Sequence, residues 1–275
     1  MKKLILTPLL LILTACSNVA FDVNQGEKIF ACDPSDLPCF PPPLVSTPGV
    51  VTILLALGDK DNMPNPTVDQ VSARSLAEKM VQYASPKEGP RVLVVEDRNH
   101  HNESPDDFTN LWRELLIRYN PTHISEPTNG LTAADVAGYD VVWIVNPGHP
   151  MGSKQTHDTL MAFSGGVILS GDDVAQGNGF NNSDLTGLNF HDNGTQVTCN
   201  GQTYRIDDNL YTNSYNVVLD NGKFADLSPS HLGFVYGNDI DNTTANSSVE
   251  VLAWATPNPP GCSDKRPVVA RYPRN

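Results

Sequence analysis

Short apolar runs alternate with segments of helical periodicity between residues 50 and 175 of this 275-residue chain. The runs are too short for helices and are typical of strands that are buried on both faces. Alternation of this kind implies parallel strands joined by right-handed crossover connections. The predicted strands cover residues 51–57, 92–96, 123–124, 141–145 and 167–170.

Residues that favour the first turn of a helix occur in the segments between these strands. Thr132 and Ser153 suit N-cap positions, because their hydroxyls can accept hydrogen bonds from the free N–H groups of a first helical turn. Pro105 suits the first position of another helix, where its missing N–H would have no partner in any case. The expected helices cover residues 67–84, 105–119, 132–138 and 153–163.

The stretch over residues 165–173 combines a helix end, a strand and a tight turn. Gly165 and Gly166 are expected to end the preceding helix, because glycine adopts a positive φ without strain. Asp172 and Asp173 then follow the strand at its carboxyl end, where open α/β sheets place their ligands. This stretch therefore predicts both a parallel sheet and the position of a site.

After residue 190 the pattern changes to short β-like segments. Residues 197–204 predict a hairpin with an Asn-Gly turn. Further strands are expected over residues 215–219, 249–255 and 268–272. The chain has no internal repeat, so we expect these segments to extend or edge the same sheet.

The first fifteen residues have the pattern of an export signal. Two lysines precede a short apolar core over residues 4–13, which is too short to span a membrane. Leu13-Thr14-Ala15-Cys16 then resembles the lipobox of bacterial lipoproteins. The resemblance implies cleavage before Cys16 and attachment of lipid, palmitate included, to its thiol and amine. Ser17 after the cysteine resembles the Gram-negative signal for outer-membrane delivery; an ordinary secretory signal beside a chance cysteine is the alternative.

The balance of charge limits the partners of the chain. Its formal net charge is −13 at pH 7, and a chain this acidic repels phosphate backbones. We therefore expect no nucleic-acid partner. Membrane attachment would come from the lipid anchor alone, and the protein would reside in the cell envelope.

Four cysteines follow Cys16, and an exported compartment permits them to form disulfides. Of the three possible pairings we favour Cys32–Cys39, which are close in sequence, and Cys199–Cys262, which lie in the C-terminal half. Free thiols are the alternative. A metal site has less support, because no Cys-x-x-Cys spacing occurs.

Composition divides the chain into three parts. Residues 1–15 form the expected signal peptide, and residues 16–48 form a Pro-rich tether that contains a run of three prolines. Polyproline is stiff and extended and cannot join a central strand, so this segment would hold the next part off the membrane. Residues 49–275 form the expected α/β domain.

The order of elements over residues 91–190 resembles that of the class I glutamine amidotransferase-like superfamily, including its trehalose-utilisation-type domains. The similarity rests on Tyr139-Asp140-Val141-Val142-Trp143 with the Pro-Gly loop that follows, on the helix after Ser153, and on residues 165–172. The resemblance implies a flavodoxin-like three-layer sandwich with a mostly parallel central sheet. The C-terminal strands would then be antiparallel additions to it.

Departures from the family pattern bear on activity. Active amidotransferases carry a cysteine at the strand-to-helix elbow, which a later His and Glu activate, whereas Asp172 stands at the elbow here and no cysteine is near it. His231 is not followed by a glutamate in a His-Pro-Glu arrangement. The resemblance therefore implies a domain that does not hydrolyse glutamine. A second resemblance, of residues 92–97 to response-regulator receivers, lacks the phospho-accepting Asp, because Asn146 stands in its place.

Polar residues follow the predicted strands and form a candidate ligand or catalytic edge. Because the carboxyl ends of parallel strands share one edge of a sheet, we expect these side chains to line a common depression. Carboxylates and imidazoles can hold a divalent cation or act as acid and base, although no cofactor is required. The alternative is that they are ordinary loop residues, with Asp172 as a helix cap. The candidates are Asp97, His100, His149, Asp172 and Asp173.

Two functions from different classes follow from these observations. The absent nucleophile and the long tether favour a non-catalytic envelope lipoprotein, whose domain binds a small-molecule ligand or an envelope protein. The alternative is a metal-assisted hydrolase that acts on a sugar or cell-wall fragment through the acidic edge.

Overall fold

A computed structural model describes the parts of the chain on which the following account rests. By its contacts the chain divides into one unit over Met1–Pro41 and a second over Pro42–Asn275. In the first unit, β1 (Val19–Phe21) pairs antiparallel with β2 (Lys28–Phe30). The predicted domain boundary at residues 48–49 stays a prediction. The described residues are 19–21, 28–30, 40, 43–53, 76–96, 117–145, 153–170, 176–177, 180–189, 196–199, 201–205, 215–219, 244–257 and 266–274.

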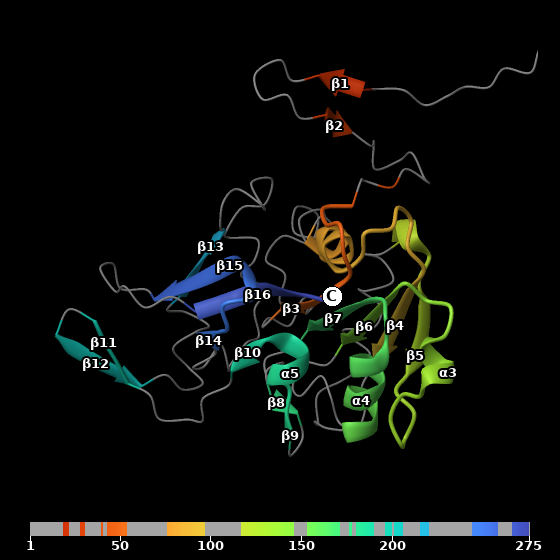
Figure 1. Cartoon of the computed structure of the whole chain (residues 1–275). Coiled ribbons are helices and arrows are strands. Elements are labelled where there is room, and N and C mark those ends of the chain that lie inside the picture. Colours follow the sequence, from red (N-terminus) through yellow and green to blue (C-terminus); the bar gives the residue numbers. More distant parts are fainter. Residues whose placement is uncertain are drawn as a thin grey trace, which may run out of the picture. The chain divides into compact units, whose positions relative to one another are not determined.

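A mixed eight-stranded sheet organises the second unit (Figure 1). Its strand order is β13-β15-β16-β3-β7-β6-β4-β5, in which the five strands from β3 to β5 are parallel and the other three are antiparallel additions. The predicted α/β class, with a mostly parallel sheet and C-terminal antiparallel strands, is confirmed. The strands are β3 (Gly49–Ile53), β4 (Val92–Glu96), β5 (Thr122–Ser125), β6 (Val141–Val145), β7 (Gly166–Ser170), β13 (Tyr215–Leu219), β15 (Glu250–Pro257) and β16 (Arg266–Pro273).

The neighbours of the parallel strands follow a recognisable order. When β4 is counted as strand 1 and the next strands are counted in chain order, the spatial order β5-β4-β6-β7 is 2-1-3-4. Flavodoxin-like sheets have the order 2-1-3-4-5. The fifth position is occupied here by β3, which precedes all the others in the chain.

The predicted positions of two helix starts are confirmed, although the Thr132 hydroxyl donates a hydrogen bond where it was expected to accept one. In α3 (Ala133–Val136), the Asp135 carboxylate accepts hydrogen bonds from the N–H and the hydroxyl of Thr132, each at 2.7 Å. In α4 (Lys154–Ala162), the Ser153 hydroxyl accepts a hydrogen bond from the N–H of Thr156 at 3.1 Å.

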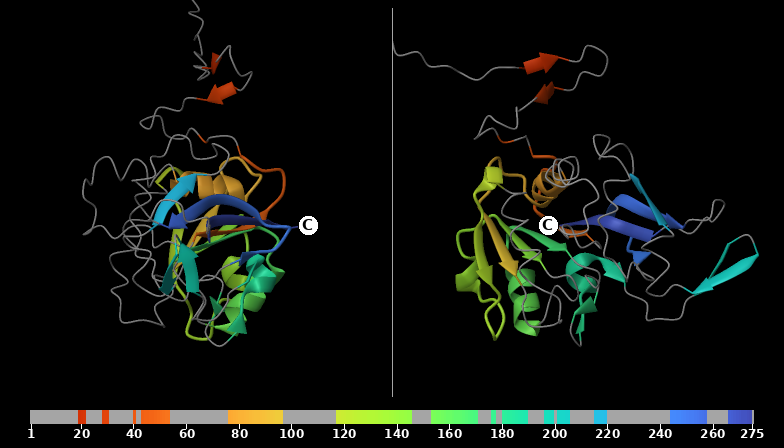
Figure 2. Two further views of the ribbon diagram at one scale, coloured as in Figure 1. Left: turned by 90° about the vertical axis from the view of Figure 1, so that its left-hand side faces the viewer. Right: turned by 180° about the vertical axis from the view of Figure 1, so that it is seen from behind.

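Other expected helices lie partly outside the described residues. Residues 76–84 are helical, and the segment expected to be a helix over residues 105–119 is described only at its end, as the 3-10 turn η1 (Ile117–Tyr119). Figures 1 and 2 place the helix over residues 76–84 and α4 on opposite sides of the sheet. Among the described helices, none has the length and apolar character that crossing a membrane requires.

Gly165 and Gly166 are needed for a reason other than the predicted one. Neither has a positive φ, and α4 ends instead at Phe163, whose backbone is extended. A Cβ on Gly166 would lie 2.3 Å from the carbonyl oxygen of Ala84, and one on Gly165 would lie 2.5 Å from that of Asp140. The prediction of a left-handed helix end was therefore wrong: these glycines let β7 approach its neighbours closely.

Smaller antiparallel pairs follow the parallel strands. The predicted hairpin is confirmed, since β11 (Gln196–Cys199) pairs with β12 (Gln202–Arg205) and Gly201 at the turn has a φ of +79°. The short helix α5 (Ser183–Thr186) ends in the left-handed glycine Gly187. The other short pairs are β8 (Gln176–Gly177) with β9 (Phe180–Asn181), and β10 (Leu188–Asn189) with β14 (Thr244–Ala245).

Candidate functional site

The five parallel strands end in a single row across the sheet. Their last residues are register partners in turn: Ile53 with Ser170, Ser170 with Val145, Val145 with Glu96, and Glu96 with Ser125. The chain therefore leaves every one of these strands at the same edge. This bears out the expectation that the strands are parallel neighbours whose carboxyl ends lie together.

The predicted site residues begin just beyond this row. Asp97, His100, His149, Asp172 and Asp173 all lie outside the described residues. Asp97 directly follows Glu96 of β4, and the two aspartates at 172 and 173 follow the end of β7 after one glycine. The segments that carry these residues thus leave the sheet at one edge. That the side chains assemble into one site stays a prediction.

The predicted cysteine roles also stay predictions. Cys16, Cys32, Cys39 and Cys262 lie outside the described residues, and Cys199 is described only as the last residue of the strand β11.

Buried polar side chains at the strand ends were not predicted from the sequence. Glu96, the last residue of β4, is 3% exposed. Its Oε2 lies 3.8 Å from Nε2 of His123 on β5. Its backbone oxygen accepts a hydrogen bond from the N–H of Glu126 at 2.8 Å, and Glu126 is itself buried. Two carboxyl groups thus lie at the ends of β4 and β5, and the imidazole of His123, from within β5, faces the first of them.

A hydroxyl chain fixes the start of α4 against this edge. The Thr156 hydroxyl donates a short hydrogen bond to the carboxylate of Glu126. Its oxygen accepts hydrogen bonds from the N–H of Leu131 at 2.9 Å and from the Ser153 hydroxyl at 3.0 Å. Residues 146–152 connect β6 to α4. These hydrogen bonds therefore hold the point at which that connection enters the helix.

Trp143, in the middle of β6, contacts the last residue of β7. Its fully buried indole N–H donates a hydrogen bond to Ser170 Oγ at 2.9 Å, and that hydroxyl donates to the carbonyl oxygen of Ile144 at 3.3 Å. A buried indole N–H needs such an acceptor. The contact holds the last residue of β7 in place, directly before the segment that carries Asp172 and Asp173.

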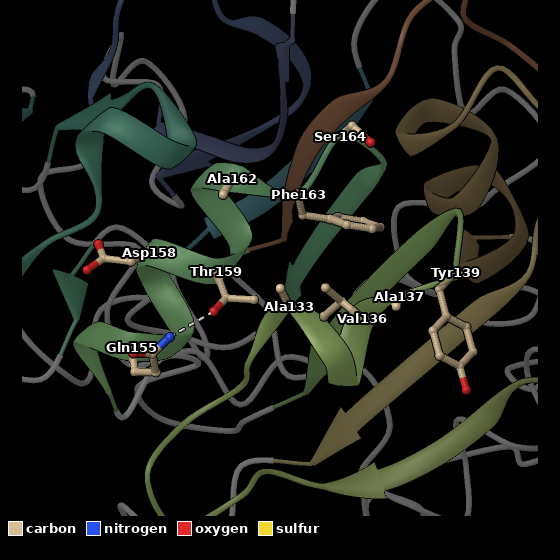
Figure 3. Close-up of a pocket in the computed structure, with 11 residues that line it drawn as sticks. Ala133, Val136, Ala137, Tyr139, Gln155, Asp158, Thr159, Ala162, Phe163 and Ser164 are labelled. Carbon is tan, nitrogen blue, oxygen red and sulfur yellow. Dashed lines mark hydrogen bonds between the residues drawn. The ribbon is translucent and has the colours of Figure 1, made fainter.

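A cavity of about 510 Å³ lies away from this edge, between α3 and α4 (Figure 3). Its volume is in the range of small-molecule sites, and small or apolar side chains form most of its lining. Asp158 is the one charged residue among those that line it, and hydrogen bonds from Lys154 and then from His157 hold the pKa of its carboxyl below the usual value. The lining comprises Ala133, Val136, Ala137, Gly138, Tyr139, Gln155, Asp158, Thr159, Ala162, Phe163 and Ser164.

Within the described part of the chain, no group of three or more His, Cys, Asp or Glu side chains is arranged to hold a metal ion. The predicted ligands of a cation lie beyond those residues. The carboxylates at the strand ends can accept hydrogen bonds, and the imidazole can donate one.

Comparison with known proteins gives no relative. No family model matches the chain, and no similar protein was found among curated proteins. The amidotransferase-like resemblance therefore rests on the sequence motifs named above alone.

Proposed function

We propose that the protein is a lipid-anchored lipoprotein of the cell envelope, held at the outer membrane of a Gram-negative bacterium, whose amidotransferase-like domain binds a ligand without catalysis. The observation that carries the proposal is the row of five strand ends that share one edge of the sheet. Open α/β sheets bind ligands outside the carboxyl ends of their strands. The lack of a cysteine near Asp172 argues against glutamine hydrolysis at this edge.

The domain fold that we propose is a flavodoxin-like three-layer sandwich. The neighbour order 2-1-3-4 of β5-β4-β6-β7 supports it, and so do the helices on the two sides of the sheet (Figure 2). In such sheets the strand order reverses between the first and third strands, and ligands bind there. Those strands correspond to β4 and β6, so the site would lie beyond Glu96 and Val145.

Acidic side chains determine what such a site would accept. Glu96 and Glu126 lie at the strand ends, and Asp97, Asp172 and Asp173 follow in the sequence. Ionised carboxylates accept hydrogen bonds and donate none. A ligand that brings hydroxyl or amine donors fits this edge, whereas a phosphate or another anion would be repelled. We therefore favour a neutral sugar or a cell-wall fragment, or an envelope protein that presents such groups.

A metal-assisted hydrolase is the second candidate. It is favoured by the acids that follow β4 and β7, whose ends are separated by β6 alone. Carboxylates close together repel one another, and a divalent cation would offset that repulsion. The same sugar or cell-wall fragment would then be cleaved rather than only bound.

Binding and cleavage can be separated with one preparation. The full-length, detergent-solubilised protein is incubated with an uncharged N-acetylglucosamine oligosaccharide, with and without Mg²⁺ or Zn²⁺. The expected result is that the fragment binds and is recovered intact by mass spectrometry. Asp172→Asn should weaken binding about tenfold, by loss of a hydrogen bond to a charged group, without lowering the melting temperature.

Glu88→Gln is the matched control, because Glu88 is exposed and precedes β4, at the opposite edge of the sheet. It should leave the affinity unchanged. Cation-dependent cleavage that Asp172→Asn abolishes would replace the binding proposal with the hydrolase. Equal affinities of the wild type and Asp172→Asn would remove the acidic edge as the site.

A further inference from the structure

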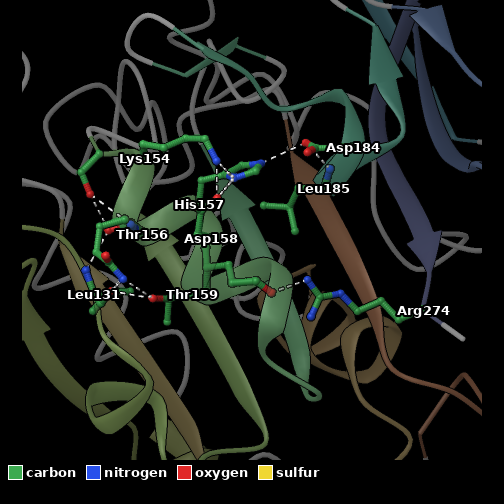
Figure 4. A network of polar contacts seen from close by, with 12 residues as sticks. Leu131, Lys154, Thr156, His157, Asp158, Thr159, Asp184, Leu185 and Arg274 are labelled. Carbon is green, nitrogen blue, oxygen red and sulfur yellow. Dashed lines mark hydrogen bonds and ion pairs between the residues drawn. The ribbon is translucent and has the colours of Figure 1, made fainter.

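A buried histidine on α4 contacts two carboxylates, one of which belongs to α5 (Figure 4). The side chain of His157 on α4 is 4% exposed, and its Nε2 lies 2.9 Å from Oδ1 of Asp184 on α5. Its Nδ1 lies 3.0 Å from Oδ1 of Asp158 on its own helix. Charged groups thus face the imidazole from both packed elements: Lys154 and Asp158 from α4, and Asp184 from α5.

The number of protons on the ring decides how many of these contacts are favourable. An ionised carboxylate only accepts hydrogen bonds, so both ring nitrogens must carry a proton for both contacts to be hydrogen bonds. That form is the imidazolium, whose charge strengthens each bond. A neutral ring leaves one nitrogen with a lone pair that faces a carboxylate oxygen.

Lys154 determines which contact the neutral ring keeps. Its Nζ lies 3.4 Å from Nδ1 of His157 and also pairs with the carboxylate of Asp158. Nδ1 can therefore accept a hydrogen bond from Lys154, which leaves the remaining proton on Nε2, toward Asp184. The Asp184 carboxylate also accepts the N–H of Leu185 at 2.9 Å, which holds it in place. The link between the two helices then persists without the charge of the imidazolium.

We propose that His157 is a proton-dependent clasp between α4 and α5, strong when the ring carries two protons and weaker when it carries one. The clasp joins the two elements that follow the connections leaving β6 and β7. The second connection carries Asp172 and Asp173. An effect of pH on ligand binding would rest on the proposed function, whereas the clasp itself does not.

Hydrogen exchange of the backbone amides of residues 183–187 tests the clasp in the full-length protein without any ligand. Histidine changes charge between about pH 5 and 8, so exchange is compared at about pH 5.5 and about pH 8 after correction for intrinsic rates. Protection of α5 should be about threefold higher at the lower pH, a modest factor because the carboxylate of Asp184 is partly exposed. His157→Gln keeps an amide donor and does not titrate, so it should remove the difference, as should Asp184→Asn.

His123→Gln is the matched control, since His123 lies on β5 and should leave the pH difference in α5 unchanged. Equal protection of α5 at the two pH values in the wild type would overturn the proposal, and so would a pH difference that persists in His157→Gln. If His157→Gln does not fold, the ring ¹⁵N shifts of the wild type decide. Ring shifts that report the same protonation state at the two pH values would contradict the clasp.

Discussion

Asp140 ties together the amino ends of three neighbouring strands. Its N–H donates to the carbonyl oxygen of Arg91 at 2.9 Å, its carboxylate accepts the N–H of Arg91 at 3.0 Å, and its carbonyl oxygen accepts the N–H of Gly166 at 2.9 Å. Lys87 also donates a hydrogen bond to the carboxylate. Arg91 lies before β4 and Gly166 begins β7, so one residue aligns β4, β6 and β7 at the edge opposite the proposed site.

Asp140→Asn should destabilise the fold by about 1–2 kcal/mol at neutral pH, because hydrogen bonds to a charged group are lost. Burial alone would raise the pKa of Asp140, but hydrogen bonds from Lys87 and from the N–H of Arg91 outweigh it and lower the pKa. A lowered pKa in the folded state gives stability that is present above the unfolded pKa and is lost as the pH falls through the folded value. Urea denaturation should therefore show a gap between variant and wild type at pH 7 that closes in acid. The same difference in stability at pH 7 and in acid would be incompatible with a role for the charge of Asp140.

Gly166→Ala tests the close approach of β7 to the helix over residues 76–84. The new Cβ would lie 2.3 Å from the Ala84 backbone oxygen, which cannot move away as a side chain could. We expect a loss of about 2–3 kcal/mol in the free energy of unfolding, as for other overpacked sites. Gly201→Ala is the control: it has a positive φ but no neighbour within 4 Å of the new Cβ. A loss at Gly166 no larger than that at Gly201 would refute the packing explanation.

At the scale of elements, the C-terminal residues of the chain cap α4. Figure 4 shows the side chain of Arg274 directed toward α4. Its guanidinium donates to the carbonyl oxygens of Leu160 at 2.6 Å, Gly165 at 3.4 Å and Phe163. The last carbonyl groups of a helix have no partner within it, so these contacts satisfy them. Burial lowers the pKa of Arg274 to about 10, which leaves it charged at neutral pH.

Arg274→Met should therefore destabilise the protein by about 1–3 kcal/mol, because it removes the donors and leaves carbonyl groups unsatisfied. Lys154→Met is the matched control on the same helix. Both side chains of the ion pair between Lys154 and Asp158 are exposed. Loss of this ion pair should therefore cost less than about 0.5 kcal/mol. Thermal unfolding of both variants measures the contrast, and equal shifts in Tm would argue against the capping role.

Local signals explain which elements could be predicted from the sequence. The run over residues 141–145 and the cap at Ser153 are read from neighbouring residues alone, and both are confirmed. The place of β3 beside β7 and β16 depends on contacts between distant segments, and no local pattern encodes it. For the same reason the close approach at Gly166 was mistaken for a helix end.

The candidate site was predicted only in part. Residues that follow apolar runs stand out as loop residues, which led to Asp97 and Asp172. Glu96 closes an apolar run and Glu126 follows a strand whose residues are only partly buried, so neither stands out by pattern. Their burial and their contacts with His123 and Thr156 arise from the packing of β5 and α4.

At the scale of the whole molecule, the proposed lipid anchor would determine where the domain works. Cys16→Ser should remain unprocessed and carry no lipid, because the cysteine supplies the thiol and the amine to be acylated. Mass spectrometry of the wild-type and variant chains from a membrane fraction measures this. A mature wild-type chain that is recovered in soluble form without lipid would rule out the anchor.

The central claim is that the segments after β4, β6 and β7 converge on one site at the carboxyl edge. Spin labels at Asp97→Cys and Asp172→Cys in the full chain measure this without a ligand. Position 97 follows β4 and position 172 follows β7, and these strands are separated by β6 alone. Because neighbouring strands lie about 4.8 Å apart, we predict a distance between labels below about 20 Å. A control pair at positions 97 and 139 spans the sheet from edge to edge and should give a longer distance. A 97–172 distance equal to or above that of the control would contradict the account.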